Sequence, residues 1–284
     1  MNKWYVTCCM MAVLAGCGAS ERHEDADGQE RIVYHLLWNA RGFSHCQILV
    51  NGVPAVVRRE GEPYHTGRST LNWFMHNGAN DIRIEAGGPQ PEGGFSVELY
   101  ATPVRIEFDQ GQLLYKFSAG TTAHTVNERV SITASIPRAW AWQSAERTQT
   151  LSSDDRQAIL ALVEQLQAAY VEKDVGKVEK LCAAAREVYD SIYTDSKAVR
   201  RSTRDVMERV FASRGYTVVP LNRDEVALTS YGQLVRAENN KGRDLIESIT
   251  ASQSDADSVA FNISVPYLLF MKQDGVWVIA GHGV

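Results

Sequence analysis

His45 to Val57 reads HCQILVNGVPAVV and carries the clearest structural signal in the first half of the chain. It holds two apolar runs joined by Asn51-Gly52, two residues that tolerate the positive φ angles of a tight hairpin turn. Pro54 has no backbone N–H to donate, so the second run should lie at a sheet edge or beside a bulge. The stretch therefore predicts an antiparallel β-hairpin.

The same signals recur over residues 31–137. Leu71, Trp73 and Met75 alternate as in a half-buried strand, and the run at 82–86 alternates back after a turn. About seven or eight short strands and no helix are expected in this part, a pattern typical of a β-sandwich. We therefore predict an antiparallel β-sandwich domain over 31–137.

The run NGANDIRIEA at 77–86 resembles turns in the sugar-binding jelly-rolls of secreted proteins. Through that resemblance, exposed aromatic rings would form a platform for a sugar, with Trp38, Trp73 and Phe74 as candidates. Trp73 shares its predicted strand face with two other apolar residues, so we favour a place in the core for these rings.

Helical spacing begins at Ser152, which stands three residues before Asp155 in a capping-box arrangement. Apolar residues then recur on one face up to Tyr170, and a break at 173–176 precedes a second helix. A third helix is expected over about 196–213. Strands should follow at about 216–220, 225–237, 244–250, 258–271 and 275–281.

Three helices followed by a meander of long strands resemble the NTF2-like, or SnoaL-like, cone fold. The closing run KQDGVWVIAGHG, Lys272–Gly283, is similar to the last hairpin of that family. The resemblance implies a curved sheet wrapped round a helix, with a pocket that Tyr231, Tyr267 and Trp277 would line. The predicted fold class is thus mainly β plus α+β: a sandwich, a linker at 138–151, and an NTF2-like domain of three helices and a curved sheet at 152–284.

The N-terminus indicates where the protein is held. Trp4 to Ala15 is an apolar run, too short to cross a bilayer core of about 30 Å but typical of a signal peptide. It leads into Leu14-Ala15-Gly16-Cys17, which resembles the lipobox of bacterial lipoproteins. The resemblance implies removal of residues 1–16, a lipid on the Cys17 thiol and an acylated new amino terminus, so that several acyl chains provide a stable membrane anchor. Gly18, in place of Asp, would favour the periplasmic face of the outer membrane in a two-membrane bacterium.

Residues 17–30 are predicted to be the lipidated cysteine and a disordered acidic tether. Five acidic side chains stand against a single arginine there, and the apolar residues are too small to build a core. Fully extended, the segment reaches at most about 45 Å. The halves that follow carry no large positive charge, so nucleic acid is not an expected partner.

Cys46 and Cys182 are the cysteines that remain beyond the lipobox. In an oxidising compartment they could form a bridge between the two halves. Each lies in an apolar pattern, so we favour two buried free thiols.

Trp140 and Trp142 stand two residues apart at the junction of the predicted domains. Paired aromatic residues often supply buried area at an interface. We predict that these two rings hold the sandwich against the second domain, and a patch for a binding partner is the alternative.

The sequence offers no catalytic template: Gly-x-Ser-x-Gly, His-Glu-x-x-His, the phosphate-binding Gly-rich loop and Cys-x-x-Cys are all missing. The histidines are scattered without metal-ligand spacing, so neither a metal nor another cofactor is expected. Arg204 and Glu208, one helical turn apart, indicate a solvated ion pair rather than an anion site. By composition alone, Asp224 and His282 would join the two tyrosines as acid–base candidates.

These observations predict a lipid-anchored bacterial envelope protein that binds a protein partner or a small ligand and is not an enzyme. One concrete version is an immunity lipoprotein that neutralises a toxin from a rival cell. The alternative is a small-molecule isomerase, dehydratase or hydrolase that uses the pocket of the cone, and the sequence leaves this alternative open.

Overall fold

The computed structural model describes residues 31–60, 65–90, 93–103, 110–120, 123–136, 139–186, 196–250 and 263–282, with the backbone alone at 196–203 and 282. The chain divides into two compact units between Trp140 and Ala141. The predicted signal peptide, Cys17 and the acidic tether lie outside the described residues. No helix in the described part is long and apolar enough to span a membrane.

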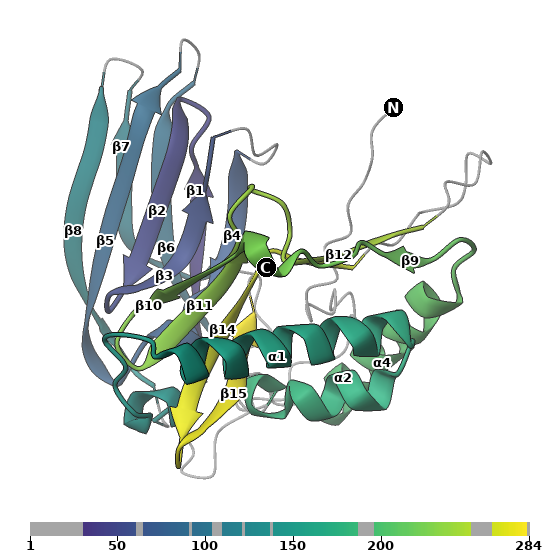
Figure 1. The fold of residues 1–284 in the computed structure, drawn as a ribbon. Coiled ribbons are helices and arrows are strands. Elements are labelled where there is room, and N and C mark those ends of the chain that lie inside the picture. The colour runs from purple at the N-terminus through teal and green to yellow at the C-terminus, as the bar shows by residue number, and fades with distance from the viewer. Residues whose placement is uncertain are drawn as a thin grey trace. The chain divides into compact units, whose positions relative to one another are not determined.

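The N-terminal unit consists of two four-stranded antiparallel sheets, whose strands run from purple to teal in Figure 1. One sheet has the order β4-β1-β6-β7, made of Thr66–Thr70, Ile32–Asn39, Phe95–Pro103 and Gln112–Ala119. The other has the order β3-β2-β5-β8, made of Val53–Arg58, Phe43–Val50, Gly78–Pro89 and Thr125–Ala134. Every pairing within these two sheets is antiparallel.

The core of this unit lies between the two sheets. Phe43 on β2 and Phe95 on β6 meet edge to face, with ring centres 5.8 Å apart. Leu36 on β1, Ile48 on β2 and Leu99 on β6 are fully buried. Each lies between two less buried neighbours on its own strand. Full burial of each such side chain stabilises the fold by about 1.5–3 kcal/mol.

The predicted hairpin at Asn51-Gly52 is confirmed. Asn51 and Gly52 have φ angles of 52° and 81° and join β2 to β3. Pro54 lies in β3, which is an edge strand, and the β2–β3 pairing shifts register between Ile48 and Leu49. Pro54 therefore lies on an edge strand, where a residue without a backbone N–H need not break the ladder.

The strand predicted at Leu71–Met75 is wrong. Asn72–Phe74 form a short 3-10 helix, η1. The Asn72 side chain accepts a hydrogen bond from Tyr34 N at 2.8 Å and donates one to Ile32 O at 2.7 Å. These bonds to β1 favour a tight turn over an extended strand, because they satisfy the Asn72 amide inside the core.

The aromatic residues of the sugar-platform alternative pack within the N-terminal unit. Phe74 is buried, and Trp73 and Trp38 are half-buried. Trp73 meets Phe74 edge to face at 4.9 Å. The Trp38 ring lies so close to Gly67 on β4 that a Cβ atom there would come within 2.7 Å of Trp38 Nε1. Phe74 thus lies in the core as predicted, whereas Trp38 and Trp73 are only partly buried against it.

The C-terminal unit combines helices with two separate sheets (Figure 1). It begins with η3 (Ala141–Ser144), followed by α1 (Ser153–Val171), α2 (Val175–Leu181), a further helical turn at 183–186 and α4 (Ser196–Ala212). One sheet has the order β10-β11-β14-β15, made of Val226–Ser230, Leu234–Asn239, Tyr267–Gln273 and Val276–His282. The other has the order β13-β12-β9, made of Ser264–Val265, Ile246–Ile249 and Thr217–Val218. A short 3-10 helix, η4 (Arg223–Glu225), precedes β10.

The predicted NTF2-like cone is wrong. That fold requires long strands in one curved sheet, whereas the described strands of this unit belong to two sheets. The strand expected at 225–237 is interrupted between β10 and β11, where Gly232 has a φ of 84°. The strand expected at 258–271 is interrupted at Pro266, which separates β13 from β14 and cannot donate to a ladder. The fold class is therefore a β-rich unit followed by a unit of helices and two small sheets.

Apolar side chains pack between the helices and one face of the four-stranded sheet. Ile159, Val163 and Leu166 of α1 belong to the same buried cluster as Leu268 and Phe270 of β14. Most of the predicted linker at 138–151 is also part of this unit: Glu146 N donates to Lys272 O at 3.0 Å, and Thr148 pairs with Gly232. The segment is thus tied to the sheet from Ala141 onward.

Candidate functional site

The three residues predicted to line a pocket are not brought together. Tyr231 lies in the turn between β10 and β11 and is half-buried. Tyr267 begins β14 on the sheet face that carries Arg236 and Glu238, whereas Trp277 of β15 belongs to the buried cluster on the helical face. Tyr267 and Trp277 thus lie on opposite faces of one sheet and cannot form a common lining.

Trp277 instead belongs to a polar group that ties α1 to the sheet. Its Nε1 donates to Asp155 Oδ1 at 2.8 Å, and Lys272 Nζ donates to the same oxygen at 3.0 Å. Ser152 completes the predicted capping box: Asp155 N donates to Ser152 Oγ at 3.1 Å, and Ser152 N donates back to Asp155 Oδ2 at 3.2 Å. The hydrogen bonds from Ser152, Trp277 and Lys272 hold the pKa of Asp155 well below its ordinary value. One carboxylate therefore serves both as a helix cap and as a link to β14 and β15.

Tyr267 lies against a buried arginine. The Arg236 guanidinium stands 3.8 Å from the centre of the Tyr267 ring, and its Nε lies 2.7 Å from Glu238 Oε2. The Arg236 side chain is 5% exposed and that of Glu238 is 14% exposed. Removing Glu238 would leave the buried Arg236 charge without this counter-ion, which costs more free energy than removing an exposed charge would.

The two junction tryptophans have separate environments. Trp140 belongs to the N-terminal unit, where its Nε1 donates to Asn72 O at 2.7 Å and to Met75 O at 2.9 Å. Trp142 is buried in η3 of the C-terminal unit. Trp140 thus donates to the carbonyls of the first residue of η1 and of its C-cap, and a domain clamp formed with Trp142 stays a prediction.

Of the composition-based acid–base candidates, Asp224 lies in η4 and is exposed, and its backbone N–H donates to Asn222 Oδ1 at 3.2 Å. His282 ends β15 opposite Leu268. The lipidation site Cys17 lies outside the described residues.

The prediction of two buried free thiols is confirmed. Cys46 and Cys182 are buried, form no disulfide bond and lie in different units. Burial raises the pKa of the Cys182 thiol to about 12, against a smaller opposing effect of the Arg186 charge. Since the thiolate is the nucleophile, Cys182 is an inert core residue rather than a reactive one.

This inertness can be measured with an alkylating agent. At about pH 8 we expect iodoacetamide to leave Cys46 and Cys182 unmodified in the native protein and to modify both in denaturant, because burial blocks access to both thiols and raises the pKa of Cys182. Peptide mapping by mass spectrometry reports each thiol separately. Equal modification of Cys182 in the native and denatured protein would contradict its placement in the core.

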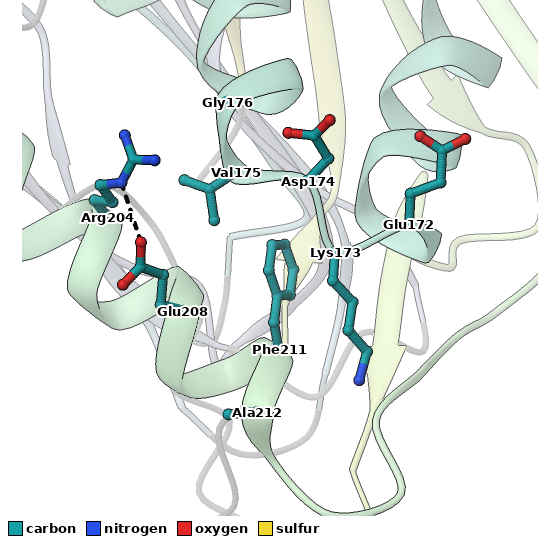
Figure 2. Close-up of a pocket in the computed structure, with 9 residues that line it drawn as sticks. All are labelled: Glu172, Lys173, Asp174, Val175, Gly176, Arg204, Glu208, Phe211 and Ala212. Atoms are coloured by element: carbon teal, nitrogen blue, oxygen red, sulfur yellow. Dashed lines mark hydrogen bonds and ion pairs between the residues drawn. The ribbon is translucent and has the colours of Figure 1, made fainter.

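The larger of the two described pockets, about 650 Å³, lies where α1 ends, α2 begins and α4 ends (Figure 2). The turn between α1 and α2 is tight because Lys173 adopts a φ of 59°. Asp174 then caps α2, since its Oδ1 accepts a hydrogen bond from Lys177 N at 2.9 Å. Phe211 is buried and belongs to an aromatic cluster with Tyr170 and Tyr216. The lining residues are Glu172, Lys173, Asp174, Val175, Gly176, Arg204, Glu208, Phe211 and Ala212.

The charged groups around this pocket are engaged with one another. Figure 2 shows Glu208 turned toward Arg204, whose Nε lies 3.0 Å from Glu208 Oε1, as the one-turn spacing predicts. Arg204 Nη1 also lies 3.1 Å from Glu179 Oε2. Lys177 Nζ lies 2.9 Å from Glu172 Oε2. These ion pairs link α2 to Glu172, just after α1, and to Arg204 of α4, whereas Lys173 Nζ lies 5.3 Å from the centre of the Tyr216 ring.

A second pocket, about 600 Å³, lies on the N-terminal unit around Asn80. Asn80 is fully buried, and its Oδ1 accepts from Asn51 Nδ2 at 2.8 Å and from His76 N at 2.9 Å. Its Nδ2 donates to His76 O and Gly78 O, both at 2.9 Å. The side-chain amide of Asn80 therefore connects the turn at Asn51 to the turn at 76–78 through its hydrogen bonds. The lining residues are Asn51, His76, Ala79, Asn80, Asp81, Arg129 and Ser131.

Replacing Asn80 with alanine tests this structural role. We expect a loss of about 1–2 kcal/mol in the free energy of unfolding, since four polar atoms of Asn51, His76 and Gly78 lose a hydrogen bond and water replaces only part of it. Urea unfolding measures the change, with Asn77→Ala as the control, because Asn77 Oδ1 accepts only one long bond of 3.4 Å from Ile136 N. Equal destabilisation by the two variants would contradict the role given to Asn80.

Sequence patterns signal few of these groups. The capping box could be found from its spacing, and the Arg204–Glu208 pair from the helical turn. The partners of Asp155 on β14 and β15, and the pairing of Arg236 with Tyr267, depend on strand register, which sequence spacing does not provide. Within the described ranges, no group of three or more acidic, histidine or cysteine residues is arranged to hold a metal ion. No protein-family model matches the chain significantly, and neither does any curated protein or solved structure.

Proposed function

We propose that this protein is a lipid-anchored component of the bacterial cell envelope that acts by binding a protein partner or a small ligand. The observation that carries the proposal is the sequence Leu14-Ala15-Gly16-Cys17, placed between an apolar run and an acidic segment. The acyl chains hold the protein at a membrane. The acidic segment acts as a disordered tether between the membrane and the folded units.

The groups with the largest pKa shifts give no support for catalysis at either described pocket. Catalytic groups are tuned by their surroundings and usually face a cleft. Here the pKa shifts of Asp155, His35 and Cys182 are large, and none of these residues lines either described pocket. The pKa of His35 is lowered to about 4, first by burial and then by the nearby Arg68 charge. The enzyme alternative depended on the pocket of an NTF2-like cone. The described strands do not form that cone, so this alternative no longer has the pocket on which it was based.

An immunity lipoprotein is one concrete version of this function. It requires a cognate toxin that binds the mature, membrane-anchored protein tightly. A toxin encoded beside it should co-purify with the detergent-solubilised protein at about 1:1 stoichiometry. Failure of that co-purification removes the immunity version and leaves the anchored binding protein.

Replacing Cys17 with serine tests the anchor. In a bacterial host fed labelled palmitate, the parent protein should carry label and sediment with membranes. Cys17→Ser should lose all label and leave the membrane fraction, because serine offers no thiol for the lipid. Cys46→Ser is the matched control and should keep both properties. Membrane-bound, labelled Cys17→Ser protein would overturn the proposal.

A further inference from the structure

We draw no further inference here: the strongest candidate, the buried Arg236 guanidinium on the face of β11 and β14 turned away from the helices, whose Nη1 donates no hydrogen bond among the described residues, carries nothing because nothing in the structure shows what covers that sheet face.

Discussion

Replacing Glu238 with alanine should lower the free energy of unfolding by about 3–5 kcal/mol, because the Arg236 charge would stay buried without its counter-ion. The two side chains are two residues apart on β11 and share one face of the strand. Stacking on Tyr267 fixes the guanidinium in place, so it cannot turn to solvent when the carboxylate is removed. The helical far-UV circular dichroism signal in a urea titration measures the loss, since the described α-helices all lie in the C-terminal unit.

The chain contains a matched control for this prediction. Arg83 and Glu85 are also two residues apart on one strand, but they lie 4.0 Å from each other with side chains 46% and 44% exposed. An exposed pair of this kind contributes about 0–1 kcal/mol, so Glu85→Ala should have little effect. The double variant Arg236→Met/Glu238→Met should recover most of the stability lost in Glu238→Ala, because it leaves no buried charge. Equal effects of Glu238→Ala and Glu85→Ala would contradict the account.

Replacing Asp155 with alanine should cost about 3 kcal/mol. A helix cap contributes about 1 kcal/mol, and hydrogen bonds to a charged group contribute about 1.5–3 kcal/mol. Asp155 provides both, since it accepts from Ser152 within the cap and from Trp277 and Lys272 on the sheet. Asp154→Ala is the control: Asp154 lies in the same first turn but is exposed, so only its interaction with the helix dipole is lost, about 0.3–1 kcal/mol.

The pH dependence of this effect has a defined sign. Folding lowers the pKa of Asp155 below its ordinary 3.8, so the folded protein favours the ionised carboxylate. Its contribution is complete above that ordinary value and is lost as the pH falls below it toward the folded pKa. The stability difference between the parent and Asp155→Ala should therefore be constant from about pH 7 to about pH 5 and shrink below about pH 4. A difference that grows on acidification would contradict the assigned bonds.

Local chemistry explains which parts of the fold could be predicted. The Asn51-Gly52 turn and the Ser152–Asp155 cap are formed by neighbouring residues, and the Asp274-Gly275 turn, with φ angles of 49° and 78°, is of the same kind. Each follows from residue conformational preferences alone. These elements were therefore within reach of the sequence.

Long-range packing explains what could not be predicted. The alternation of Leu71, Trp73 and Met75 is typical of a strand, but bonds from Asn72 to β1 hold the segment as a 3-10 turn. Pro266 cannot donate to a ladder, and it lies between β13 and β14, which belong to different sheets. Apolar periodicity alone does not determine which strands pair, so it could not distinguish two sheets from one curved cone. For the same reason, apolar periodicity could not show that Tyr267 and Trp277, two of the predicted pocket residues, lie on opposite faces of one sheet.

Intact-mass analysis of the protein extracted from membranes tests whether Cys17 carries the lipid anchor. We expect the mature chain to begin at Cys17, with a diacylglyceryl group on its sulfur and an acyl group on its amino terminus. Tandem mass spectrometry of the N-terminal peptide should place the added mass on Cys17 alone. An unmodified Cys17, or a chain that retains residues 1–16, would contradict the proposal.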